Sequence, residues 1–210
     1  LNHIGTLGGG NHFIEVGACK NEAWLIIHSG SRGIGHRVAK KYMIKASSSE
    51  KNYEKTSPLD INSKIGKEYL NILEFGLGYA LLNRLEMSYR VIGAIESIIK
   101  EKIKAELWVN KNHNHALHIK EGYIHRKGAT PAEKKERGVI PANMRDGSFL
   151  VVGLGNKKFL NSSSHGAGRA MSRAEARKNI TMSRFRESMK DIKSNVTEKI
   201  LDEAPDAYKN

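Results

Sequence analysis

Apolar residues fall into short runs and one long periodic stretch. The short runs are bounded by polar residues or glycine and predict buried strands at residues 13–16, 24–27, 107–109 and 149–152. Between residues 79 and 104, apolar positions recur every three to four residues, which predicts a long amphipathic helix. Shorter helices are expected over 34–46 and 166–177, each opening at a glycine-rich turn. The pattern therefore predicts a mixed α/β fold.

We expect this fold to form one compact domain over residues 1–210, with a central sheet whose strand ends present side chains to a single cleft. No internal repeat is visible, and only the serine-rich stretch from Ser47 to Pro58 is typical of an exposed loop. The chain begins at Leu1 without a methionine or signal peptide and stops at Asn210 without a tapering tail. We therefore expect it to be a piece of a longer protein.

The charge balance favours a polyanionic partner. Lys and Arg number 35 against 22 Asp and Glu, which gives a net charge of +13. Nucleic acid is favoured over a membrane surface, and a generally basic surface is the alternative. No apolar run is long enough to span a bilayer, so no membrane partner is expected. The single cysteine, Cys19, excludes an intrachain disulfide and fits a reducing compartment, so we expect a cytoplasmic protein.

The strongest chemical signal is a histidine directly before a glycine-rich turn. His165 precedes Gly166, Ala167 and Gly168, and Arg169 follows. Glycines let backbone N–H groups approach a ligand, and an arginine fork fits phosphate oxygens. A neutral imidazole in that setting can attack a phosphoryl group. The alternative is a helix N-terminus at which the histidine is only a cap.

Three more histidines follow or precede predicted strands. His12 comes after a triple glycine, His28 closes the second strand, and His113 follows the third. Imidazoles from three strand ends could converge on one divalent transition metal, although any one of them could equally be a structural histidine. The remaining histidines are interpreted as structural or as neighbours of the site: His3, His36, His115, His118 and His125.

Polar turns near these histidines add candidate phosphate contacts. His28 is followed by a Ser/Gly run that contains Arg32, and this combination suits an oxyanion. Arg126 and Lys127 open a compact basic turn, which is typical either of phosphate binding or of a solvated loop. The stretch from Pro141 to Ser148 could bind a nucleotide or form an ordinary turn before a strand.

Taken together and in this order, these motifs resemble the RtcB family of RNA ligases. The motifs that carry the resemblance are GTLGGGNHFIEV from Gly5, HSGSRG from His28, His113–Asn114, RKGAT from Arg126 and HGAGR from His165. The resemblance runs from Gly5 to Tyr208, nearly the whole chain. It implies an enzyme that joins RNA 3′-phosphate or 2′,3′-cyclic phosphate ends to 5′-hydroxyl ends, with GTP and Mn²⁺ as cofactors, in RNA splicing or repair.

The resemblance also implies a role for each matching residue. His165 would attack GTP and carry GMP, and His12, His28 and His113 would hold one or two Mn²⁺ ions. Contacts to the guanine nucleotide would come from Asn11, Glu15, Asn114, Ser148, Gly166, Ala167, Gly168 and Tyr208. Contacts to phosphate or RNA would come from Arg32, Arg126, Lys127 and Arg169. The implied partners are RNA with those ends, GTP and an accessory activating protein.

The chain also departs from the family pattern. The family's metal site uses an upstream Asp and a bridging Cys, and Cys19 lies downstream of His12, where it does not match. A lysine that holds the guanine belongs beyond Tyr208. Ala142 and Asn143 stand where the family more often has Gly-Ser, which is typical of a compact bacterial branch. We therefore expect the 210 residues alone to be inactive through truncation.

Two other functions fit part of the sequence. A metal-dependent phosphatase or nuclease would explain the three histidines and the basic charge, but it gives His165 and its glycine turn no function. An inactive RNA-binding fragment would explain the charge alone. Covalent attachment of GMP distinguishes the ligase from both.

Overall fold

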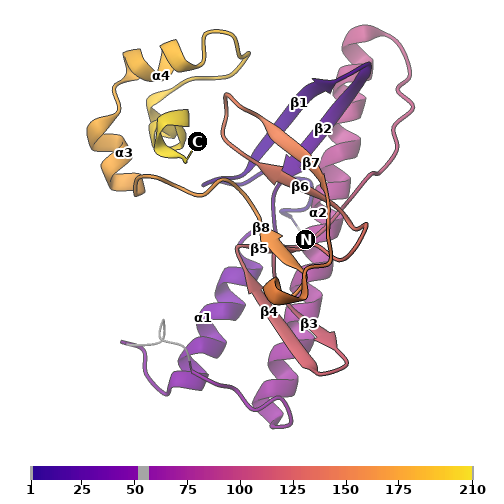
Figure 1. Ribbon diagram of the computed structural model, residues 1–210, viewed down its shortest axis with the longest axis vertical. Helices are drawn as coiled ribbons and strands as arrows, with labels where there is room; N and C mark the ends of the chain where they lie inside the picture. Colours follow the sequence, from indigo (N-terminus) through magenta and orange to yellow (C-terminus); the bar gives the residue numbers. More distant parts are fainter. Residues whose placement is uncertain (1, 52–56, 210) are drawn as a thin grey trace. The chain divides into compact units, whose positions relative to one another are not determined.

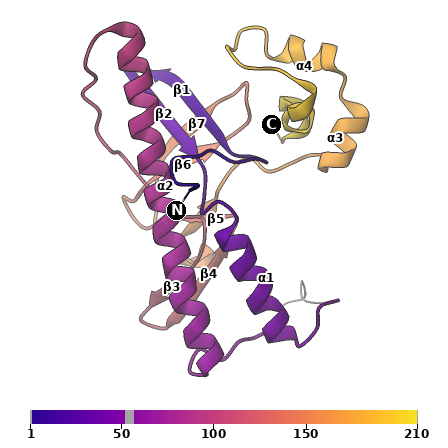
Figure 2. The same ribbon diagram turned by 180° about the vertical axis from the view of Figure 1, so that it is seen from behind.

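The computed structural model describes residues 2–51 and 57–209. The backbone divides into two compact units. Unit 1 comprises Leu1–Ile14 and Ile27–Arg126, and unit 2 comprises Glu15–Ile26 and Lys127–Asn210. Figures 1 and 2 show the elements of both units from opposite sides. Of the predicted serine-rich loop, residues 52–56 lie outside the described residues.

Unit 1 is built on two helices. α1 (Ile34–Ser47) occupies the range predicted from the sequence and packs against α2 (Lys64–Ile99) (Figure 2). The buried Tyr42 of α1 donates its hydroxyl to Glu68 of α2 at 3.1 Å. α2 begins well before the predicted residue 79, because the side chain of Ser63 caps its N-terminus. It ends before residue 104, because Lys100 is left-handed there.

The strand predicted at residues 107–109 is not formed. That segment is irregular, and the first strand after α2 is β3 (Asn114–Ile119), which pairs with β4 (Gly122–Lys127). Side chains hold the following segment to α2 in place of a strand ladder. Asn110 donates its amide to the carbonyl of Leu81 at 3.1 Å, and Asn112 donates to that of Leu77 at 3.3 Å.

Unit 2 contains short strands and a small helical subdomain. β5 (Ala129–Pro131) pairs antiparallel with β8 (Ser162–Ser164), and β6 (Arg137–Pro141) pairs antiparallel with β7 (Ser148–Val152). β7 confirms the strand predicted at 149–152. The helices are α3 (Arg173–Asn179) and α4 (Met182–Ser188), followed by short 3₁₀ turns, η2 (Glu198–Glu203) and η3 (Pro205–Ala207). Another 3₁₀ turn, η1 (Lys157–Phe159), precedes β8.

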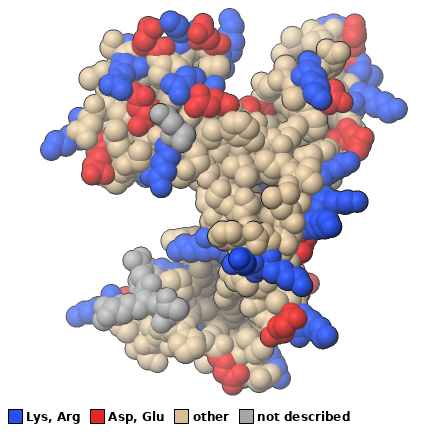
Figure 3. All heavy atoms as spheres, viewed as in Figure 1, with Lys and Arg blue, Asp and Glu red and all other residues tan. Residues whose placement is uncertain are grey.

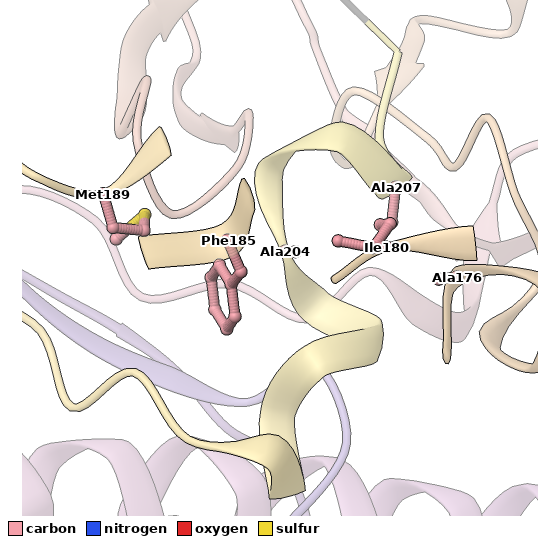
Figure 4. Packing of buried hydrophobic residues seen from close by; sticks show 6 residues of the cluster. All are labelled: Ala176, Ile180, Phe185, Met189, Ala204 and Ala207. Carbon is pink, nitrogen blue, oxygen red and sulfur yellow. The ribbon is translucent and has the colours of Figure 1, made fainter. Parts of the chain in front are cut away.

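The helical subdomain has its own hydrophobic core. Phe185 is fully buried between α3, α4 and the C-terminal 3₁₀ turns (Figure 4). The cluster is completed by Ala176, Ile180, Met189, Ala204 and Ala207. This packing holds the C-terminal 3₁₀ turns and Tyr208 against α3 and α4.

The helix predicted over 166–177 begins only at Arg173. Ser172 forms a capping box with Glu175, which sets the true N-terminus. The preceding residues are instead held by the C-terminal segment: Met171 N–H donates to the carbonyl of Ala207 at 3.2 Å, and Lys209 N–H donates to that of Gly168 at 3.0 Å. The residues from Gly166 to Met171 are therefore not helical, and some of their backbone groups hydrogen-bond to the C-terminal segment.

The mixed α/β class is confirmed, but the strands do not form one central sheet. Within the described residues they pair two by two in four sheets, because each strand finds a single partner. β1 (Phe13–Cys19) and β2 (Glu22–His28) form one of these pairs, as their apolar runs predicted.

No helix in the described part of the chain is both long enough and apolar enough to cross a membrane. Figure 3 shows lysine and arginine side chains in several separate groups on the face that it displays, with acidic side chains among them. The basic charge is therefore distributed on that face and does not form one uniform patch.

Candidate active-site residues

Two of the three candidate metal-binding histidines meet in unit 1. His28 ends β2 and His113 directly precedes β3, and their Nε2 atoms lie 3.0 Å apart. Their rings are nearly perpendicular, with centroids 5.1 Å apart. Two nitrogens that each lie about 2.1 Å from one ion, at a right angle, are separated by about 3.0 Å. The spacing therefore suits either a hydrogen bond between the rings or two ligands of a shared cation.

His12 lies beside this pair with its tautomer fixed. Its ring centroid is 5.8 Å from that of His28, and its Nδ1 lies 2.8 Å from the carbonyl oxygen of Leu7. Since a carbonyl only accepts, Nδ1 must carry the proton, which leaves Nε2 with a free lone pair. Burial, together with the charge of Arg32, lowers the pKa of His12 despite that hydrogen bond.

The histidine donors fit a transition metal in part. Imidazole suits Mn, Fe, Co, Ni, Cu and Zn, and a backbone carbonyl that orients the far ring nitrogen is typical of metal-binding histidines. Over residues 2–51 and 57–209, however, no three His, Cys, Asp or Glu side chains are placed as ligands of one ion. The chain thus presents two imidazoles at ligand spacing with a third beside them.

Arg32 lies against the glycine turn that precedes His12. Its Nε donates to the hydroxyl of Thr6 at 3.0 Å, and a Cβ at Gly8 would lie 1.7 Å from its Nη1. Gly8 also has φ +91°, so only glycine fits here. The sequence predicted close approach at this glycine run, and the group that approaches is the arginine. Asn11, which follows the run, is exposed.

The basic turn has one buried and one exposed cation. Arg126 is 5% exposed, and its Nη1 lies 3.1 Å from Nε2 of His115. Burial, with the charge of Arg126, lowers the pKa of His115, which is neutral and accepts this bond. Lys127 is exposed. Arg126 therefore has a structural partner, and Lys127 is the better candidate for phosphate.

His165 packs against a glycine in unit 2. A Cβ at Gly128 would lie 2.9 Å from Nε2 of His165 and 3.0 Å from its Cδ2, and Gly128 has φ +70°. The absent side chain leaves space for the imidazole ring. Burial lowers the pKa of His165, so the ring is neutral at physiological pH. A half-buried neutral imidazole on an irregular turn has the properties of a nucleophile.

The same unit brings together two predicted nucleotide-binding stretches. Ala167 N–H donates to the carbonyl of Pro141 at 3.1 Å, which joins the turn after His165 to the loop between β6 and β7. At the end of that loop, the Ser148 hydroxyl donates to the Glu15 carboxylate at 2.7 Å. The sequence predicted both Glu15 and Ser148, and the structure brings them into contact.

Arg169 does not have the free guanidinium expected of a phosphate ligand. Nε donates to the carbonyl of Met171 at 2.9 Å, and Nη1 lies 3.3 Å from both Glu203 and the hydroxyl of Tyr208. Nη2 donates to the carbonyl of Asp202. Burial and the Glu203 carboxylate raise the pKa of Tyr208 to about 12. Arg169 thus anchors the C-terminal segment, and its contact with phosphate stays a prediction.

Tyr208 also lines a polar hollow of about 270 Å³ in unit 2, together with Met171, Asn179, Ile180, Arg184 and Asp206. Of the other predicted nucleotide contacts, Asn114 is an exposed residue of unit 1 at the start of β3. The predicted residues therefore divide between the units. The candidate metal ligands belong to unit 1, and His165, Glu15, Ser148 and Tyr208 belong to unit 2.

Sequence reasoning missed two polar residues in the middle of α2. Asn83 is fully buried, and Arg84 is largely buried, with its pKa lowered to about 10 by that burial. Both hydrogen-bond to loops that carry the candidate histidines. The signal was available, because an adjacent amide and guanidinium interrupt the apolar run from Tyr79 to Leu85.

Comparison with known proteins gives consistent matches. Residues 1–210 match the family model described as tRNA-splicing ligase RtcB. The chain is 34% identical over 226 residues to RNA-splicing ligase RtcB of Escherichia coli K12, which covers 99% of this chain and 55% of that protein. It is 29% identical over 261 residues to tRNA-splicing ligase RtcB of Methanococcus maripaludis. That match covers 100% of this chain and 54% of the archaeal protein. The chain thus spans about half the length of these curated relatives.

Proposed function

The chain belongs to the RtcB family of tRNA-splicing ligases, and from that membership we propose that it carries the guanylylation centre of a GTP- and Mn²⁺-dependent RNA ligase. The reaction joins an RNA 3′-phosphate, or a 2′,3′-cyclic phosphate opened to it, to a 5′-hydroxyl. One observation carries the proposal: His165 is a half-buried histidine whose pKa is lowered, and it packs on Gly128 in the unit that also holds the Glu15–Ser148 pair.

His165 is the nucleophile in the first step. Its neutral imidazole nitrogen attacks the α-phosphorus of GTP, and the bond between the α-phosphorus and the bridging oxygen breaks. Pyrophosphate leaves with the electron pair, and a proton is lost from the ring. Burial favours this step, because the lowered pKa of His165 keeps a lone pair available near neutral pH.

Glu15 supports selection of guanine. A carboxylate only accepts hydrogen bonds, and the Watson–Crick edge of guanine presents N–H donors that adenine does not offer in the same arrangement. Ser148 donates to one oxygen of that carboxylate, which fixes its orientation and leaves the other oxygen for a ligand. Asn11, Asn114 and Tyr208 remain proposed nucleotide contacts.

His12, His28 and His113 would hold Mn²⁺. The bound ion supplies positive charge that offsets charge crowding on the phosphates. The chain's own contribution is to keep imidazole nitrogens available: His28 and His113 face each other at 3.0 Å, and the Leu7 carbonyl fixes the tautomer of His12. Mn²⁺ also favours oxygen ligands, so further carboxylate or solvent ligands would complete the site.

The later steps use the activated GMP. An oxygen of the RNA 3′-phosphate attacks the GMP phosphorus, and the bond to the His165 nitrogen breaks. The 5′-hydroxyl of the second RNA end then attacks the 3′-phosphate, and GMP leaves. The net charge of +13 favours binding of the RNA backbone, with an affinity that falls as salt rises. Arg32 and Lys127 are the proposed phosphate contacts.

A joining assay tests this function. RNA with a 3′-phosphate and a 5′-hydroxyl is incubated with the chain extended to the full length of its relatives, GTP and Mn²⁺, and products are resolved by length. The control RNA carries a 3′-hydroxyl and a 5′-phosphate. Joining of the first RNA alone, with GTP and not ATP, supports the proposal. Cleavage or dephosphorylation without GTP would instead support a metal-dependent hydrolase.

A further inference from the structure

The buried Asn83 side chain joins two loops of unit 1. Its Oδ1 accepts from the backbone N–H groups of Gly5 at 2.8 Å and Thr6 at 3.2 Å. Its Nδ2 donates to the carbonyl of Gly30 at 3.2 Å. Because backbone N–H groups only donate and carbonyls only accept, the orientation of the amide is fixed by its partners. One loop precedes β1 and the other follows β2.

A chain of hydrogen bonds leads from Asn83 to His12. Nδ2 of Asn83 also donates to the hydroxyl of Ser29 at 3.1 Å. The Ser29 hydroxyl in turn donates to the carbonyl of Leu7 at 2.7 Å. That carbonyl is the same one that Nδ1 of His12 approaches at 2.8 Å. The amide therefore reaches His12 through two intervening groups, and Ser29 directly follows His28.

Arg84 joins the loop after His28 to the loop before His113. Its Nη1 donates to the carbonyl of Ser29 at 3.0 Å, its Nε to Asn110 Oδ1 at 2.7 Å, and its Nη2 to Asn112 Oδ1 at 3.1 Å. All three guanidinium nitrogens are engaged. A planar fork makes this three-way connection, and a lysine ammonium cannot reproduce it.

We propose that Asn83 and Arg84 are positioning residues that set the spacing of His12, His28 and His113. They act through the loops next to each histidine. The inference rests on the proposed metal-binding role of the histidines and adds the part of the chain that preorganises them. Asn83 and Arg84 both lie on α2, and their hydrogen-bond partners lie in the loops next to the three histidines. The helix therefore holds these loops in place relative to one another.

The decisive variant is Arg84→Lys, which keeps the charge and most of the stem. The first measurement is made without metal: nuclear Overhauser contacts between the ring protons of His28 and His113. The second is the affinity for Co²⁺ alone, followed by its visible absorption in imidazole coordination. We expect the ring contact to weaken and Co²⁺ to bind about tenfold more weakly, since loss of groups that orient ligands costs 10–100-fold.

Tyr42→Phe is the matched control, because it removes one partly buried hydrogen bond between α1 and α2 in the same unit. It should lower the unfolding temperature and leave the ring contact and Co²⁺ affinity unchanged. If Arg84→Lys does not fold, Asn112→Asp keeps an oxygen acceptor for the Arg84 fork and removes only the bond to the Leu77 carbonyl, whereas Asn112→Ala removes both; only Asn112→Ala should then weaken the same ring contact.

The two proposals fail in different ways. Wild-type ring contacts and Co²⁺ affinity in a folded Arg84→Lys or Asn112→Ala protein would overturn the positioning role. Absence of Co²⁺ binding by the wild type would count against the metal role, and the ring contacts of the metal-free variants would still decide the positioning role.

Discussion

Replacing Gly128 by alanine should displace the proposed nucleophile without altering its chemistry. The new Cβ would lie 2.9 Å from Nε2 of His165, where comfortable contact needs about 3.5 Å. The ring must therefore retreat by roughly 0.5 Å. A misplacement of about 1 Å costs about 100-fold in rate, so we expect formation of the GMP adduct to slow about tenfold.

The same substitution also strains the backbone. Gly128 has φ +70°, where a residue with a side chain costs about 1–2 kcal/mol. Gly122→Ala is the control, because Gly122 also has positive φ, yet a Cβ there meets no atom within 4 Å. Both variants should unfold at a lower temperature, and only Gly128→Ala should react more slowly.

The assay is the rate of mass gain on intact protein at saturating GTP, below the unfolding temperature of each variant. A wild-type rate in Gly128→Ala would refute the placement of His165 against Gly128. Equal slowing in both variants would attribute the effect to backbone strain and would refute the steric reasoning.

Four further predictions concern the ionisable groups of unit 2. The rate of adduct formation should stay level as pH falls below 6.5, the ordinary value for histidine, and decrease only through the lowered pKa of His165, as measured by a pH–rate profile. As pH falls, His165 is protonated in the unfolded chain before it is protonated in the folded protein. Its contribution to stability is therefore present above pH 6.5 and is lost as pH falls through its folded-state pKa. A pH series of urea titrations checks this, and an unchanged midpoint would contradict it. Glu15→Gln should reduce the preference for GTP over ATP at least tenfold in competition assays, because the amide no longer presents only acceptors; unchanged preference would remove Glu15 from guanine recognition. Asp202→Asn should lower the free energy of unfolding by about 1–2 kcal/mol, since Asp202 is 3% exposed and pairs with the half-exposed Arg173 and Arg177; a urea titration that shows no loss would contradict a structural role for this cluster.

Several elements could be predicted from the local pattern of apolar residues alone. The apolar runs that became β1, β2 and β7 were correct, as was α1, which follows a glycine-rich turn. The run at 107–109 was not a strand, because its neighbours Asn110 and Asn112 hydrogen-bond to α2. The late start of α3 was set by the Ser172 cap, a signal present in the sequence but outweighed by the glycine turn before it.

The candidate site shows the same limit. Spacing in the sequence could not bring His28 and His113 to 3.0 Å, or Glu15 and Ser148 to 2.7 Å, since these residues are 85 and 133 positions apart in the chain. Nor could it assign Arg169 to Glu203, because that pairing depends on how the C-terminal segment folds back. Residue types indicate a candidate chemistry, and tertiary packing determines which of the candidate groups lie next to one another.

The most direct test of the proposed function is covalent guanylylation. The chain, extended to the full length of its relatives, is incubated with GTP and Mn²⁺, and its intact mass is compared with parallel samples that contain ATP or the His165→Ala variant. We expect one added GMP with GTP, none with ATP and none in His165→Ala. An adduct that persists in His165→Ala would contradict the assignment of the nucleophile. No adduct in the wild type would contradict the ligase.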